Sequence, residues 1–209
     1  MRTRVRSGDP DAYAELFDGY ARTLYNHAFR MTGDWAVAED VMSAAFLEAW
    51  RLRGTVDPEG GSLRPWLLGI ATNIARNHCR GNRRYRAAAG AAAAAAGAAS
   101  VPDHAEEVAG RLDDRRRIAA TLAQLSALRA PEREVLLLCV CEGLEYAEAA
   151  RALGIPVGTV RSRLSRARTK LRRLADAELR KKRREPAARP RQTHGDRANA
   201  VRSAQEGTR

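Results

Sequence analysis

The chain has 209 residues and a formal net charge of +12 at pH 7, from 37 basic and 25 acidic residues. This length fits one ordinary domain or two small ones, and the basic balance favours polyanionic partners. The three cysteines have no ligand spacing to histidines, which argues against a disulfide scaffold and a zinc site; we expect no metal and no cofactor. No apolar run approaches the roughly 18 residues of a membrane span. The N-terminus also lacks an apolar signal core, so we expect a cytoplasmic protein without membrane insertion.

A first helical block is predicted over residues 7–86. Ser7 or Asp9 is a suitable cap for its first helix and Asp34 for its second, while Gly33 separates the two. Apolar residues recur at helical spacing through each segment, and no stretch of the chain alternates with a period of two. The fold is therefore predicted to be all-α. The expected helices of this block cover residues 7–33, 34–54 and 63–80.

An alanine-rich stretch follows, with "AAAGAAAAAAGAA" at residues 87–99. Alanine favours helix, but this stretch has no apolar face to bury, so we interpret it as a flexible tether. A second helical block follows the tether, where Pro131 begins a helix that Gly143 ends. Cys139 and Cys141 lie in its apolar run "VLLLCVC" and are expected to be small buried hydrophobic residues. The predicted organisation is two small helical domains at 7–86 and 111–179, a flexible Ala-rich linker at 87–110, and a basic, disordered tail at 180–209.

The second domain is predicted to contain a helix-turn-helix, formed by "YAEAARAL", the turn "GIPVG" and the basic helix after it. With Val160 and Leu164 facing inward, four side chains project from the N-terminal half of the basic helix, where base edges are normally read, and arginine matches guanine in a bidentate manner. Cationic side chains on its other faces or further along suit phosphates. The expected base readers are Arg161, Ser162, Ser165 and Arg166, and the expected phosphate contacts are Arg163, Arg168, Lys170, Arg172 and Arg173.

Three segments resemble one known family in the same order. "LEYAEAARALGIPVGTVRSRLSRARTKLR" is similar to the promoter-reading region of extracytoplasmic-function (ECF, group IV) sigma factors of the sigma-70 family. "DWAVAEDVMSAAFLEAW" and "PWLLGIATNIARNHCR" resemble the amino-terminal region of these proteins. The resemblance covers residues 10–86 and 111–175 and implies a dissociable initiation subunit of bacterial RNA polymerase.

The resemblance also implies the partners. The first domain would clamp core RNA polymerase through the β′ coiled coil and open the minus-ten element of promoter DNA. The second domain would read the minus-thirty-five element as a duplex and meet the β flap. The tether would run through the RNA exit path of the polymerase. An anti-sigma factor is a further partner that the resemblance leaves open.

Individual roles follow the resemblance position by position. Asp40, Ser43 and Leu47 share a helix face at i, i+3 and i+7 and would bind the polymerase. At Ser43 and Ala44 this sequence departs from the family, in which Gln and Glu are usual, and this departure bears on the strength of that contact.

The third helix of the first block would face the non-template strand of the minus-ten element. Asn73 aligns with an asparagine that touches an extruded base, and loop 54–62 corresponds to the segment that forms a pocket for a flipped base. An exposed basic face continues beyond Asn73 and suits a single-stranded backbone; its residues are Arg76, Asn77, Arg80, Arg83 and Arg84. In the second domain, Tyr146 and Thr159 stand at two helix starts, where hydroxyl groups reach phosphates.

Three other functions are weighed against a sigma factor. An autonomous helix-turn-helix regulator that acts without polymerase would need a dimerisation element, and the sequence offers no heptad or spare apolar helix for one. An enzyme would need a metal cluster, a phosphate-binding loop or a nucleophile motif, and none is visible, so we expect no enzymatic activity. A nucleoid-type binder would use the basic tail and would not need an ordered first domain.

Overall fold

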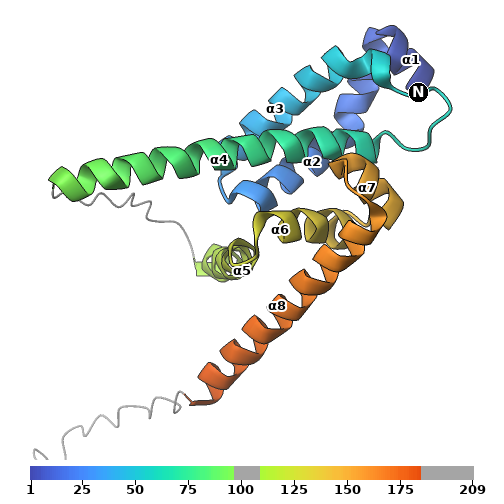
Figure 1. Cartoon of the computed structure of the whole chain (residues 1–209). Helices are drawn as coiled ribbons and strands as arrows, with labels where there is room; N and C mark the ends of the chain where they lie inside the picture. Colours follow the sequence, from blue (N-terminus) through green and yellow to red (C-terminus); the bar gives the residue numbers. More distant parts are fainter. Residues whose placement is uncertain (97–108, 185–209) are drawn as a thin grey trace, which may run out of the picture. The chain divides into compact units, whose positions relative to one another are not determined.

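The computed structural model describes the backbone of residues 1–96 and 109–184, and the side chains of residues 1–82 and 117–180 (Figure 1). Every regular element within this part of the chain is a helix. Two units are distinguished, Met1–Leu174 and Ala175–Arg209, and all side chains with a predicted site role lie in the first. The elements are α1 (Arg2–Ser7), α2 (Pro10–Thr32), α3 (Trp35–Leu52), the 3-10 turn η1 (Arg53–Thr55), α4 (Arg64–Ala96), α5 (Ala109–Ser126), α6 (Ala130–Leu136), the π-helical turn η2 (Leu137–Cys141), α7 (Tyr146–Leu153) and α8 (Val157–Arg184).

The predicted caps of the first block form as expected. Of the two candidate caps for α2, the structure uses Asp9, whose carboxylate accepts hydrogen bonds from the backbone N–H groups of Asp11 and Ala12. Asp34 caps α3 by accepting from the N–H of Val37 at 3.1 Å. Gly33 ends α2 with φ of 75°, a left-handed conformation that glycine adopts without steric cost.

Helices α2, α3 and α4 pack against one another and bury an apolar core. Leu16 and Leu24 of α2, Val41 of α3 and Leu67 of α4 are almost completely buried. Trp35 stacks on Phe29 with a ring separation of 3.5 Å at the edge of this core. The helical spacing of apolar residues in the sequence therefore produces a three-helix packing that fixes the exposed faces of α3 and α4.

Several helices differ from the expected boundaries; among them, α8 continues as helix through residues 180–184, which were expected to belong to the disordered tail. Helix α1 is not predicted by the sequence pattern, and the third helix is expected to end near residue 80, whereas α4 continues to Ala96. Residues 87–96, expected as linker, are thus helical, in keeping with the high helix propensity of alanine. The remaining central residues of the expected linker (97–108) and most of the expected tail (185–209) lie outside the described residues.

The second block contains a π-helical turn that its sequence did not reveal. Pro131 lies at the start of α6 as predicted, but from Leu137 to Cys141 the helix widens, and the N–H of Glu142 donates to the carbonyl of Leu137 at 2.9 Å. The prediction that Cys139 and Cys141 are buried is wrong for Cys141, which is exposed, while Cys139 is half-buried. The wider turn leaves only its first two side chains, both leucines, in the core.

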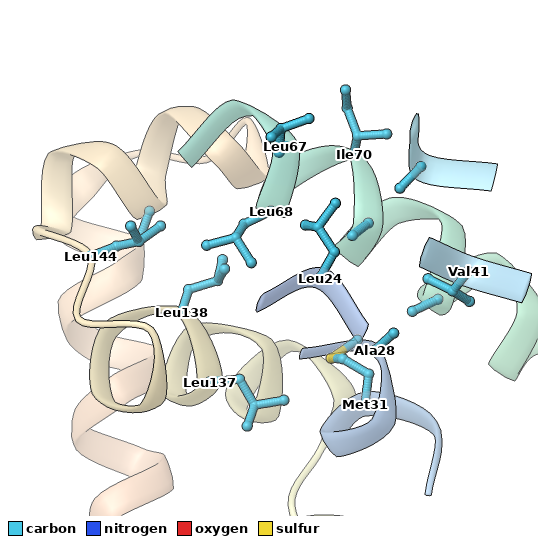
Figure 2. Close-up of a cluster of buried hydrophobic side chains, with 14 of the residues drawn as sticks. Leu24, Ala28, Met31, Val41, Leu67, Leu68, Ile70, Leu137, Leu138 and Leu144 are labelled. Atoms are coloured by element: carbon cyan, nitrogen blue, oxygen red, sulfur yellow. The ribbon is translucent and has the colours of Figure 1, made fainter. Parts of the chain in front are cut away.

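The two helical blocks share one apolar core. Leu138 and Leu144, from residues 109–174 (the C-terminal half), face Leu24 and Leu68 of residues 1–96 (the N-terminal half; Figure 2). Helix α7 also packs along α4. The sequence did not predict this contact between the halves, because apolar periodicity shows which face of a helix is buried but not which partner buries it.

Candidate nucleic-acid interface

Helices α7 and α8 form the predicted helix-turn-helix. Gly154 ends α7 in a left-handed conformation with φ of 64°, and the N–H of Ile155 donates back to the carbonyl of Ala150 at 3.0 Å. Glu145 and Glu148 form a capping box at the start of α7. Val160 and Leu164 are buried as predicted, which fixes the exposed face of α8. Ala149 and Ala150 of α7 and Ala167 of α8 are buried with them.

All four predicted base readers lie exposed on the second and third turns of α8; they are Arg161, Ser162, Ser165 and Arg166. The hydroxyl of Ser162 donates to the carbonyl of Thr159 at 3.0 Å, which holds it against its own helix. Arg166 is 62% exposed and lies 3.9 Å from the carboxylate of Glu132. Arg161 and Arg166 can therefore reorient towards a groove of DNA. Arg166 would give up only a weak ion pair with Glu132.

The predicted phosphate contacts are less uniform. Tyr146 and Thr159 are half-buried in the first turns of α7 and α8, and Arg168 is exposed. Lys170 is exposed and donates to the carbonyl of Ala127. Arg163 is half-buried and lines a cavity between α4, α6 and α8, so in this arrangement it is turned away from the exposed face.

The predicted minus-ten residues lie on one side of α4. Asn73, Asn77 and Arg80 are exposed. Arg76 differs, because its guanidinium pairs with the buried Glu134 of α6 through two hydrogen bonds of 2.8 and 2.7 Å. The backbone of Arg83 and Arg84 continues α4, but their side chains lie outside the described residues.

A cavity of about 450 Å³ adjoins these residues. Asn73, Trp66 and the loop from Val56 to Ser62 line it, together with Glu148 and Arg151 of α7. Loop 54–62, which the resemblance implies as a base pocket, thus lies beside Asn73. The volume of this cavity is within the range of small-molecule sites. One of its walls is formed by α7, which belongs to the C-terminal half.

Arg2 holds this loop in place, which the sequence analysis did not predict. Its guanidinium donates to the backbone carbonyls of Asp57, Gly61 and Ser62. These partners lie more than 50 residues away along the chain, so no local sequence signal could have identified them.

The predicted polymerase-binding residues share an exposed face of α3. Asp40 and Ser43 are exposed, and Leu47 is 69% exposed. Beside Leu47 lies a hollow that Ile70 and Ile74 of α4 also line. The face therefore combines an exposed apolar side chain with polar neighbours, as protein-docking surfaces do.

Glu142, which the sequence analysis also missed, is buried between the halves. Its carboxylate lies 2.9 Å from Arg30 and 2.9 Å from Arg64, and 3.8 Å from the Nδ1 atom of the buried His27. Burial alone would raise the pKa of this carboxyl, but His27 and the two arginines outweigh burial and lower the pKa below its ordinary value. Glu142 is therefore an anion at neutral pH, held by cations of the other half.

No metal centre competes with this interpretation within the described part of the chain, where no group of three His, Cys, Asp or Glu side chains is placed to hold an ion. In the same residues no helix is both long and apolar enough to cross a bilayer. Fold and surface together define a helix-turn-helix protein with a second, basic surface on α4.

Comparison with known proteins identifies the family. Sigma-70 region 2 matches residues 16–85, and sigma-70 region 4 matches residues 118–171. The sigma factor CarQ of Myxococcus xanthus is 34% identical over 82% of this chain and 93% of its own length. The ECF sigma factor SigK of Mycobacterium sp. (strain KMS) is 32% identical over 77% of this chain and 81% of its own.

A solved structure agrees. The chain is similar to that of the sigma factor RpoE in complex with the anti-sigma factor NepR from Bartonella quintana, with 26% identity, a TM-score of 0.56, and coverage of 79% of this chain and 97% of that chain. This chain belongs to the ECF sigma factors of the sigma-70 family. It is an RNA polymerase sigma factor, which confirms the predicted function. The helices of the described residues confirm the predicted all-α fold.

Proposed function

We propose that this ECF sigma factor is of group IV and directs core RNA polymerase to a two-part promoter in the cytoplasm, without enzymatic activity of its own. Residues 7–86 bind the polymerase and the minus-ten element, and residues 111–179 read the minus-thirty-five element. Residues 87–110 connect the two regions along the RNA exit path, and residues 180–209 add basic charge. The observation that carries this proposal is that the four predicted base-reading side chains are exposed on α8, directly after the turn at Gly154 that completes the helix-turn-helix.

At the minus-thirty-five element, Arg161, Ser162, Ser165 and Arg166 meet base edges. Both arginines are exposed near the start of α8, and each can bind the O6 and N7 atoms of a guanine. Tyr146, Thr159, Arg163, Arg168 and Lys170 position the domain on phosphates. For Arg163 this requires a rotation away from the cavity that it now lines.

At the minus-ten element, Asn73 contacts an extruded base at the cavity beside loop 54–62. A polar side chain at the mouth of a cavity offsets part of the few kcal/mol that unstacking costs. The single-stranded backbone follows the basic face of α4, formed by Arg76, Asn77, Arg80, Arg83 and Arg84.

Asp40, Ser43 and Leu47 bind the β′ coiled coil, and the C-terminal half meets the β flap. The exposed Leu47 supplies the apolar centre of the first contact. The structural relative in complex with an anti-sigma factor supports an anti-sigma factor as a regulator of this chain too.

The test is run-off transcription with bacterial core polymerase on a pool of randomised promoters. Wild-type protein is expected to select one two-part motif, and Arg161→Ala/Arg166→Ala to lose mainly the upstream half of it. The matched control is Arg172→Ala/Arg173→Ala, which removes the same charge further along α8 and is expected to lower the yield while preserving the motif. DNA binding by the wild type without polymerase-dependent initiation would favour an autonomous helix-turn-helix regulator instead.

A further inference from the structure

The loop between η1 and α4 has few means of its own to keep a fixed shape. Val56 and Leu63 anchor its two ends, since each is at most 3% exposed. Residues 57–62 between them include two glycines and contribute no side chain to the apolar core. A glycine backbone has more conformations to lose than any other. The shape of the segment 57–62 therefore depends on the hydrogen bonds that hold its backbone.

One guanidinium joins the two arms of this segment. The Nε atom of Arg2 in α1 donates to the carbonyl of Asp57 on the first arm. Its Nη1 atom donates to the carbonyls of Gly61 at 2.9 Å and Ser62 at 3.2 Å on the second arm. The planar guanidinium presents several donors in fixed directions, which the ammonium of a lysine does not. Arg2 therefore acts as a clamp that holds both arms of the segment together.

Helix α1, which carries the clamp, is itself fixed by packing. Val5 is completely buried, and Arg6 donates to the carbonyl of Val56 at 2.9 Å. At Gly8, where α1 ends, a Cβ atom would stand only 3.0 Å from a side-chain atom of η1. Figure 1 shows the N-terminus next to the loop that leads into α4. The clamp on the segment 57–62 thus extends from a firmly held helix.

The clamped segment borders the cavity of about 450 Å³ that Asn73 also lines, and Arg2 is part of the same lining. A Cβ atom added at Gly60 would stand 2.6 Å from the Nη2 atom of Arg2. The guanidinium therefore lies directly against the backbone at the tip of the segment. The position of Arg2 sets the position of this cavity wall.

We propose that Arg2 is a positioning residue for promoter recognition, which fixes the segment 57–62 in the shape that accepts one particular extruded base. The inference rests on the proposed role of loop 54–62 and Asn73 in binding that base. A wall of fixed shape rejects a base that does not fit, because the misfit cannot be relieved, whereas a mobile wall adapts to several bases. Arg2 thereby sets how strictly one position of the minus-ten element is read.

The test uses the full chain with an untagged N-terminus, bound to core polymerase. The wild type first selects a minus-ten sequence from the randomised pool, and templates carrying each of the four bases at each minus-ten position are then compared by run-off transcription. Arg2→Gln is expected to lower the preference at one position by about fivefold and to leave the other positions unchanged.

Arg4→Gln is the matched control. It removes the same charge from the same helix, but in the described contacts the side chain of Arg4 pairs with Asp9 and Glu15 and not with the loop. These pairs are largely exposed, so their loss should matter little for α1. Base preference with Arg4→Gln is expected to equal that of the wild type.

Gly60→Ala displaces the clamp without removing its charge. The added methyl group meets only the end of the flexible Arg2 side chain, which can swing away, so the fold should tolerate it. Gly60→Ala is expected to lower the same preference as Arg2→Gln, and the double variant to lose no more than Arg2→Gln alone, since no guanidinium remains to displace. Gly19→Ala is its control, because a Cβ atom at that glycine meets nothing within 4 Å.

Amide hydrogen exchange of the free protein reports the clamp directly and needs no polymerase. Exchange within residues 57–62, followed by mass spectrometry, is expected to quicken by about tenfold in Arg2→Gln and in Gly60→Ala. The two controls, Arg4→Gln and Gly19→Ala, should exchange as the wild type does.

Faster exchange together with a lower preference at one minus-ten position supports the proposal. Faster exchange with unchanged base preference would overturn it, because Arg2 would then matter only for the shape of the loop. Unchanged exchange would overturn it too, and so would an equal loss at every promoter position. Should Arg2→Gln fail to fold, Gly60→Ala decides. Absence of polymerase-dependent initiation by the wild type would instead overturn the proposed function, and this inference with it.

Discussion

The guanidinium of Arg76 and the carboxylate of Glu134 face each other across the two halves of the molecule, joined by hydrogen bonds of 2.8 and 2.7 Å. The sequence predicts a DNA contact for Arg76 and assigns no role to Glu134. Their pairing shows that a basic side chain of the predicted DNA surface is also a contact between the halves. A guanidinium binds a carboxylate and a DNA phosphate in the same way, through two parallel hydrogen bonds to two oxygens.

Replacing Glu142 should destabilise the fold. Glu142→Gln removes the charge that Arg30 and Arg64 share; both arginines are about one-third exposed and can turn to water, so we expect a loss of about 1–2 kcal/mol, below the full cost of breaking a buried pair. Urea unfolding of the full chain measures it. Glu48→Gln, at an exposed pair of 3.8 Å, should cost less than about 0.5 kcal/mol. Equal losses in the two variants would contradict the prediction.

The contribution of Glu142 should depend on pH. Its folded-state pKa is lowered, so the unfolded chain takes up the proton first as the pH falls. Its contribution is therefore complete above the ordinary carboxyl pKa of 4.5 and is lost as the pH falls below that value through the folded-state pKa. The difference in unfolding free energy between the wild type and Glu142→Gln should shrink over this range. A difference that stays constant with pH would refute this assignment.

Substitutions on α8 should separate base reading from phosphate binding. Arg161→Ala is expected to relax the preference at one base pair of the minus-thirty-five element by about 1–3 kcal/mol. Arg168→Ala should weaken binding to all sequences alike and reduce the slope of log affinity against log salt by about 1. Competition binding at several salt concentrations measures both, and the prediction fails if the two variants behave alike.

Leu47 should contribute to polymerase binding but not to folding. It is 69% exposed, so Leu47→Ala is expected to leave the midpoint of thermal unfolding unchanged while weakening binding to core polymerase by about 1 kcal/mol or more. Val140→Ala, at a 52% exposed apolar residue of the other half, is the matched control. Core polymerase affinity by surface plasmon resonance distinguishes the two.

Asp34 should stabilise α3 through its cap. Asp34→Ala removes the acceptor for the N–H of Val37 and is expected to cost about 1 kcal/mol, whereas Asp34→Asn retains an acceptor and should cost less. Chemical denaturation of both variants tests this, and equal losses would show that charge rather than capping matters at Asp34.

Local features were readable from the sequence because their causes are local. The caps at Asp9 and Asp34, the turn at Gly154 and the buried stripe of α8 each depend on residues within one or two helical turns. For the same reason the exposure of Arg161 and its neighbours followed from the positions of the apolar residues. The π-helical turn after Leu136 escaped prediction, since "VLLLCVC" fits an ordinary buried helix equally well.

The sequence by itself determined the all-α class, the helix-turn-helix and the positions of Arg161 and Arg166 on the exposed face of α8, because helical periodicity and capping act over a few residues. Only the tertiary structure decided that Glu134 meets Arg76, that Glu142 gathers Arg30 and Arg64, and that α7 covers α4 at Gly69. These partners lie tens of residues apart along the chain. Many pairings would satisfy the same charges and apolar faces, and the packing of the whole core selects one of them.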